Sequence, residues 1–210
     1  GLRQREPAEG TAGSERTVVK VLRDAAALYV GIRASDRDPA GIVATQYRRD
    51  AELDVDDNVG FIIDSYDEQR TAFGFATNPN GMMWDGQFGG VEEVNRNWNG
   101  IWDVAVTRDS AGWTAEFRIP FRTLRFHDGR EVTFGFNVRR FIRRRNEEVL
   151  WQSWLRNQGI SNLRFEGDLV IADSLVRGFD AEIRPNAIFK YALPEHDSSG
   201  VETARSVASF

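Results

Sequence analysis

The chain has 210 residues, of which 41% are hydrophobic and 28% charged, a composition that is typical of one globular domain and too apolar for a disordered chain. Its formal net charge of −5 argues against general nucleic-acid affinity, since that requires a basic surface that displaces phosphate counterions. The absence of cysteine excludes disulfides, thiolate catalysis and cysteine-ligated zinc.

Polar residues fill the first segment, residues 1–16, which is predicted to be a loop or an entering tail. The chain opens without an initiator methionine or a signal peptide, and we expect it to be a piece of a longer protein. From residue 17 onward, short runs rich in β-branched and aromatic residues are separated by turn residues. They predict three hairpins, formed by residues 17–23 with 28–35, 59–65 with 71–77, and 102–108 with 113–121.

Alternation with a period of two marks the next strand, residues 132–141, where Val132, Phe134, Phe136 and Val138 fall on one face. Helical periodicity is nearly absent. Several short strands at this spacing predict an all-β fold, an antiparallel β-sandwich. A closing strand follows at 169–173, and a fresh alternating run begins at 178, so a domain boundary is expected near 175–178.

Acidic residues gather before the second hairpin, where Asp54, Asp56 and Asp57 could supply oxygen ligands to a calcium ion. The spacing is not that of an EF-hand. The alternative is a solvated turn in which aspartates cap backbone amides, and the sequence leaves both interpretations open.

Tryptophans fall into two groups. Trp102 and Trp113 begin strands and are predicted to lie in the core. Trp84, Trp98 and Trp154 lie in polar, glycine- and asparagine-rich stretches, where an exposed ring could form an apolar platform for a sugar.

An arginine-rich stretch, residues 139–145, could hold phosphate or a carboxylate. Strand alternation would send its side chains to both faces, and two glutamates follow it directly. A paired, solvated strand end is therefore the favoured interpretation.

Signals for catalysis are weak. His127 lies in a predicted turn and His196 in the polar C-terminal tail. The nucleophile-elbow, zinc-protease and phosphate-loop motifs do not occur. The paired acids Asp56-Asp57 and Glu92-Glu93 are adjacent in sequence, and neighbours in a strand point to opposite faces, unlike the carboxylates of a glycosidase. The sequence therefore predicts binding, although a glycoside hydrolase remains an alternative.

Three stretches, residues 19–39, 54–81 and 98–126, resemble a family 9 carbohydrate-binding module, and GWTAEFRIPFRTLRF is the most specific part. The resemblance covers about residues 17–175 and implies a DOMON-like β-sandwich that binds sugar chain ends between aromatic rings, often beside structural calcium. By this resemblance, Arg70 is the candidate sugar-bonding arginine. A family carboxylate is replaced by Gly60. The candidate ligand residues are Trp84, Trp154, Arg70, Trp98 and Asn80, with Asp54, Asp56 and Asp57 as calcium ligands.

RRFIRRRNEEVLWQSW also resembles the variant of this module found at the N-terminus of bacterial outer-membrane β-barrel proteins. The resemblance implies that residues 176–210 are a linker and the start of a β-barrel of the same chain, and that the family's first strand precedes Gly1. The expected function is that of a non-catalytic domain of the bacterial cell envelope that binds carbohydrate, linked to xylan-type polysaccharides. The alternative is a structural or protein-interaction sandwich that caps the barrel and has lost the sugar site.

Overall fold

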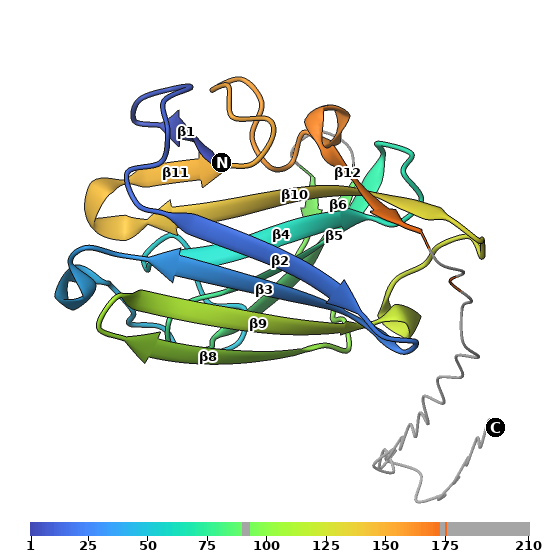
Figure 1. Cartoon of the computed structure of the whole chain (residues 1–210), viewed down its shortest axis with the longest axis horizontal. Helices are drawn as coiled ribbons and strands as arrows, with labels where there is room; N and C mark the ends of the chain where they lie inside the picture. Colours follow the sequence, from blue (N-terminus) through green and yellow to red (C-terminus); the bar gives the residue numbers. More distant parts are fainter. Residues whose placement is uncertain (90–92, 173–174, 176–210) are drawn as a thin grey trace, which may run out of the picture. The chain divides into compact units, whose positions relative to one another are not determined.

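Two antiparallel sheets, stacked face to face, make up the computed structural model of the chain (Figure 1). The structure describes residues 1–89, 93–172 and 175. Within them the predicted fold class, an antiparallel β-sandwich, is confirmed. The expected linker and barrel start at 176–210 lie outside the described residues.

The larger sheet contains, in spatial order, β1 (Arg3–Glu6), β11 (Glu147–Leu150), β10 (Val132–Ile142), β4 (Asn58–Asp64), β5 (Thr71–Thr77), β6 (Met83–Gly89) and β7 (Val94–Asn95), while β12 (Gly167–Ile171) pairs with the first half of β10. The smaller sheet contains β2 (Thr17–Arg23), β3 (Ala27–Ser35), β9 (Gly112–Pro120) and β8 (Asp103–Asp109). Among the described residues, four single 3-10 turns connect the strands: η1 (Pro39–Gly41), η2 (Phe121–Thr123), η3 (Arg143–Arg145) and η4 (Leu163–Phe165). In the described part of the chain, no helix is long and apolar enough to cross a membrane.

The three predicted hairpins are confirmed as β2–β3, β4–β5 and β8–β9. The prediction for residues 1–16 was wrong in part, because Arg3–Glu6 forms β1 and pairs with β11. This pairing makes the N-terminal segment an edge of the larger sheet.

Alternating residues of both sheets form the main hydrophobic core. The predicted set on β10, Val132, Phe134, Phe136 and Val138, lies inside it. Aromatic rings join the sheets across the sandwich, because Phe61 of β4 meets Phe117 of β9 edge to face with 5.0 Å between ring centroids. Trp102 and Trp113 are buried in this core, as predicted.

A second, smaller hydrophobic cluster covers the outer face of the larger sheet. It contains Ile62 of β4, Ala72 and Ala76 of β5, and Trp84 and Phe88 of β6. All seven residues of β4 are therefore buried, since one face of the strand packs on the sandwich core and the other on this outer cluster. Side chains and loops therefore pack on the outer face of the larger sheet as well, and a cavity can form between them and the strands.

Arg140 of β10 joins the two sheets at one end of the sandwich. Its position in the alternation points into the core, and it is 1% exposed. Its Nη1 donates to the Arg16 carbonyl oxygen and Thr17 Oγ1, and its Nη2 donates to the Ser35 carbonyl oxygen at 2.9 Å. The guanidinium thus holds the start of β2 and the end of β3 against β10.

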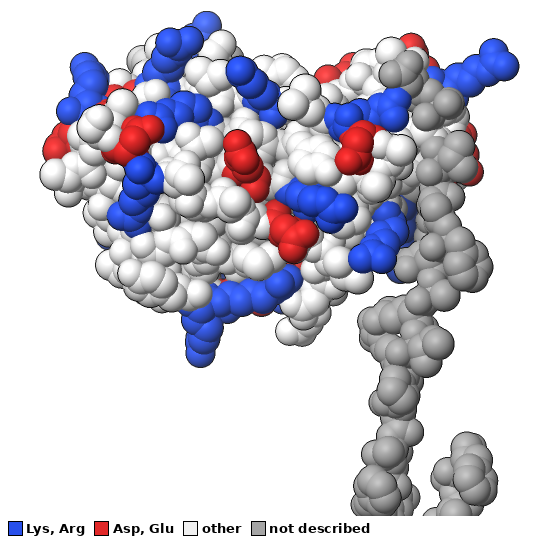
Figure 2. Space-filling view, turned by 60° about the horizontal axis from the view of Figure 1, so that its bottom comes forward, with Lys and Arg blue, Asp and Glu red and all other residues white. Residues whose placement is uncertain are grey.

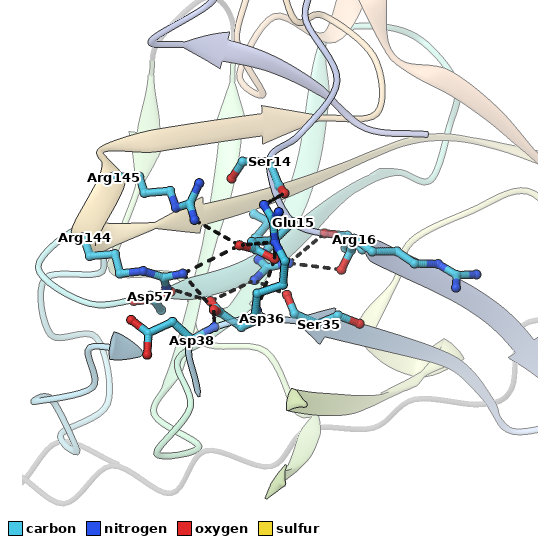
Figure 3. Close-up of polar contacts among 12 residues, drawn as sticks. Ser14, Glu15, Arg16, Ser35, Asp36, Asp38, Asp57, Arg144 and Arg145 are labelled. Atoms are coloured by element: carbon cyan, nitrogen blue, oxygen red, sulfur yellow. Dashed lines mark hydrogen bonds and ion pairs between the residues drawn. The ribbon is translucent and has the colours of Figure 1, made fainter. Parts of the chain in front are cut away.

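Further charges complete this buried network (Figure 3). Asp36, which follows β3 and is fully buried, lies 3.8 Å from Arg140 and accepts two 2.7 Å hydrogen bonds from Arg144. Burial alone would raise the pKa of Asp36, but the hydrogen bond from Arg144 and other favourable contacts outweigh it, so the pKa falls. Glu15 accepts a hydrogen bond from Arg145 at 3.1 Å. The arginine-rich stretch is paired, as predicted, but it is not a solvated strand end, because Arg140 is buried.

We expect Arg140→Ala to lower the free energy of unfolding by about 3–5 kcal/mol, because removing one partner of a buried ion pair leaves the other charge uncompensated. Urea denaturation measures the change. Arg122→Ala is the matched control, since Arg122 is exposed and such surface changes stay within about 0.5 kcal/mol. Equal losses in the two variants would contradict the role given to Arg140.

Candidate functional site

A cavity of about 230 Å³ opens on the outer face of the larger sheet; we call it the sheet cavity. Its floor contains the small residues Gly60, Gly74 and Ala76 of β4 and β5. Trp84 and Phe88 of β6 form its apolar side. Its polar lining comes from Glu52, Asp54, Asn58, Arg96 and Arg139. An apolar concavity with a few polar groups is the usual form of a small-molecule site.

One wall of the sheet cavity comes from the loop that precedes β4. The buried carboxylate of Asp56 fixes the start of this loop by accepting hydrogen bonds from the backbone N–H groups of Thr45 and Gln46, at 2.8 and 2.9 Å. Asn78 donates to the same carboxylate at 2.8 Å. This bonding holds the loop, and with it Leu53 and Asp54, beside the cavity.

The opposite wall comes from the loop after β11. Asn137 of β10 fixes this loop, since its amide donates to Ser153 Oγ at 2.7 Å and to the Gln152 carbonyl oxygen, and accepts from the Gln152 N–H at 3.0 Å. Ile160 and Ser161, farther along the loop, then line the cavity. Both walls are therefore held by buried polar side chains, Asp56 just before β4 and Asn137 within β10.

Arg139 is the central charged group of the sheet cavity. It donates to Glu148 at 2.5 Å, to Asn58 at 3.1 Å and to Asp54 Oδ1 at 2.9 Å. Burial lowers the pKa of Arg139, but the charges of Glu148 and Asp54 outweigh that effect and raise it. Asp54 is half exposed, and its Oδ2 accepts no hydrogen bond from the described residues. That oxygen can accept a hydroxyl hydrogen from a ligand.

The tryptophans predicted to be ligand platforms lie in three different surroundings. Trp84 was expected in a loop, and that prediction was wrong, because Trp84 lies on β6. There it is 9% exposed and lines the sheet cavity. Trp98 is half-buried and packs on Phe73 and Phe75, on the sandwich side of the sheet. Trp154 lies beside Arg3, whose guanidinium is 5.5 Å from its ring centroid. The structure does not bring the three rings together.

Arg70 and Asn80, two other predicted ligand residues, do not line the sheet cavity. Asn80 is bonded within the protein, because it donates to the carbonyl oxygens of Ala44 and Gln46 and accepts from Arg108 at 2.6 Å. Arg70 is exposed directly before β5 and lines a separate cavity. The sequence did not point to Phe88, to Arg96 or to the role of Arg139. One signal was available, because β4 is an almost unbroken apolar run, which is typical of a strand covered on both faces.

Three carboxylates were expected to bind calcium, and their arrangement does not fit that ion. Asp56 is bonded to backbone amides and Asn78, and Asp54 to Arg139 and Asn58. Asp57 accepts from the Val43 N–H at 2.9 Å, and burial raises its pKa. Among the residues that the structure describes, no group of three histidine, aspartate or glutamate side chains could hold a metal ion. Asp56 and Asp57 cap backbone amides, as the alternative expected, but both are buried, so the turn is not a solvated one.

Glu166 lies next to the wall loop, just before β12. Both of its carboxylate oxygens are buried and accept no hydrogen bond from any residue that the structure describes. Burial and the neighbouring acids Asp64, Asp67 and Asp168 raise its pKa to about 8. The group is therefore protonated at neutral pH, and its hydroxyl can donate to Asp64.

Charges of both signs are interspersed over the molecular face in Figure 2, which shows no broad area of a single sign. On that face, no one-sided field would attract a charged polymer. Recognition is therefore better sought in local groups, such as those of the sheet cavity.

Comparison with known proteins decides the family. The family model described as "Carbohydrate family 9 binding domain-like" matches residues 5–163. The chain belongs to this family. The members of the carbohydrate family 9 binding domain-like family are binding modules, which agrees with the predicted resemblance; association with the outer-membrane barrel variant stays a prediction. No curated protein matches the chain.

Solved structures agree with this family assignment. A protein of Bacteroides uniformis ATCC 8492, for which carbohydrate binding is proposed, has a TM-score of 0.64 at 10% identity, covering 84% of this chain and 86% of that chain. A family 9 carbohydrate-binding module of Caldicellulosiruptor kristjanssonii, solved with glucose and with cellotriose, has a TM-score of 0.55 at 16% identity, covering 88–89% of this chain and 88% of that chain. At these identities the similarity shows a shared fold.

We expect stability to fall as pH rises from about 5 to 8, because the folded protein keeps the Glu166 proton that the unfolded chain releases near the usual pKa of 4.5. Above pH 8 this contribution is lost and the slope disappears. Glu166→Gln, which keeps a donor toward Asp64, should remove the slope. Urea midpoints measured across this range test the prediction.

Glu131→Gln is the matched control, because Glu131 is exposed. This variant should keep the wild-type slope. Identical pH profiles for wild type and Glu166→Gln would show that the Glu166 carboxyl is already ionised in the folded protein.

Proposed function

We propose that the chain is a non-catalytic carbohydrate-binding domain that holds a sugar residue in the sheet cavity. The main support is the position of this cavity on the outer face of the larger sheet, in a member of a family of carbohydrate-binding modules. At about 230 Å³ the cavity is smaller than the ~300–1,000 Å³ sites that enclose drug-sized ligands. Its size therefore suits one sugar ring of a longer chain.

The chemistry of the lining supports a sugar. The apolar side formed by Trp84 and Phe88 suits the C–H face of a pyranose. The free Oδ2 of Asp54 and the exposed guanidinium of Arg96, which lies 3.9 Å from Glu52, can accept from and donate to hydroxyl groups. The two carboxylates of the lining are each paired with an arginine, Glu52 with Arg96 and Asp54 with Arg139, so the proposal is binding without catalysis.

A structural or protein-interaction domain is the second candidate. The observation that favours it is the low exposure of the aromatic side of the cavity, because Trp84 and Phe88 are 9% and 5% exposed. Narrow access to these rings would weaken stacking on a sugar. Binding measurements separate the two candidates.

Isothermal titration with gluco- and xylo-oligosaccharides tests sugar binding at the sheet cavity. We expect Asp54→Ala to weaken binding about tenfold, since a hydrogen bond to a charged group contributes about 1.5–3 kcal/mol. Asp103→Ala is the control, because Asp103 is 77% exposed on β8 of the smaller sheet. If the wild type binds no glycan, or if the two variants bind with equal affinity, the result favours a structural or protein-interaction domain.

We also propose that the domain acts in the bacterial cell envelope, beside a β-barrel of the same chain and in the use of xylan-type polysaccharides. The support is the resemblance carried by residues 139–154. The full-length protein is then expected in the outer-membrane fraction of its native cells, detected by immunoblot. Recovery in the cytosolic fraction would refute the envelope assignment.

A further inference from the structure

A second cavity, of about 410 Å³, lies near the sheet cavity; we call it the arginine cavity. Arg70, which precedes β5, and Arg164, in η4, both line it, together with Thr71 and Asn162. Ser161 lines both cavities. A ligand that extends beyond the sheet cavity along this shared wall therefore reaches the two arginines.

The two arginines of this cavity differ from those of the sheet cavity in having no hydrogen-bond or ion-pair partner among the residues that the structure describes. Arg139 donates to three protein side chains, and Arg96 lies near Glu52. Arg70 and Arg164 are both exposed, and neither makes a hydrogen bond or an ion pair with the described residues. Within the described part of the chain, the arginine cavity therefore presents two positive charges without an ion-pair partner, one from the turn before β5 and one from η4.

The backbone at both arginines is held in place. The Asp64 carboxylate accepts from the Tyr66 N–H at 3.1 Å and from the Gln69 N–H at 2.6 Å, which fixes the turn that ends at Arg70. Leu163, beside Arg164, is 4% exposed and packs in the outer cluster. Only the two side chains must be ordered when an anion binds, which limits the entropic cost.

We propose that the arginine cavity is an anion subsite, and that the domain prefers acidic oligosaccharides whose uncharged unit occupies the sheet cavity while a carboxylate or sulfate of a neighbouring unit binds Arg70 and Arg164. The planar guanidinium groups match the geometry of such oxyanions. This inference rests on the proposed sugar binding and adds the substrate class.

Titration calorimetry with two acidic probes, hyaluronan oligosaccharides and glucuronic-acid-branched xylo-oligosaccharides, in both of which each acidic unit has an uncharged neighbour, tests the inference. Each probe is compared with its carboxyl-reduced form, which has the same backbone without the charge. We expect the acidic form to bind about five- to tenfold tighter at low salt, as two exposed charge contacts allow. The difference should shrink as NaCl screens it. A sulfated xylo-oligosaccharide shows whether the subsite also accepts sulfate.

The double variant Arg70→Gln/Arg164→Gln should lose the preference but keep the affinity for the reduced probes. The control Arg48→Gln/Arg122→Gln removes two exposed charges elsewhere and should keep the preference. Equal binding of acidic and reduced probes by wild type, or equal preference in both double variants, would overturn the subsite while leaving neutral sugar binding intact. If wild type binds neither form, the proposed function itself fails.

Discussion

Two consecutive arginines on β10, Arg139 and Arg140, bind protein groups on the two opposite faces of the larger sheet. Arg140 points into the sandwich and binds the ends of β2 and β3. Arg139 points to the outer face and binds Asp54 and Glu148. The same stretch of β10 therefore joins the two sheets through one face and positions the wall of the sheet cavity through the other. A shift of β10 by one residue would exchange these roles and break both sets of contacts.

Hydrophobic alternation was sufficient to predict most of the sandwich, because the core strands bury one face in a regular pattern. It could not reveal β1. The sequence of that strand, RQRE, is polar, and its partner β11 begins with two glutamates. The pair is held by the ladder and by ion pairs such as Arg5 with Glu148. Strands that are stabilised by backbone pairing and ion pairs show no alternation of apolar residues in the sequence. Their pairing is therefore visible only in the structure.

The candidate site was harder to predict than the fold. Trp84 was assigned to a loop because glycine and asparagine surround it, yet residues 84, 86 and 88 share one face of β6, and the rings of Trp84 and Phe88 both belong to the outer cluster. The glycine- and asparagine-rich composition around Trp84 therefore concealed the alternation, with a period of two, that marks β6 as a strand. The charged residues of the cavity come from the loop before β4, from beyond β7 and from β10, and no spacing along the chain indicates that they meet. The assembly of such a site depends on tertiary pairing.

Gly60 shows how packing limits the chemistry of the cavity floor. A Cβ atom at this position would lie 2.7 Å from the Cβ of Ala76 and 2.7 Å from the Phe75 carbonyl oxygen. The carboxylate that the family resemblance leads one to expect there therefore cannot be accommodated without moving β5. The floor must stay small and apolar, so polar recognition shifts to the walls, where Asp54 and Arg139 already have fixed partners. Specificity in this domain then depends less on the floor of the sheet than on the loops that the buried side chains of Asp56 and Asn137 hold in place.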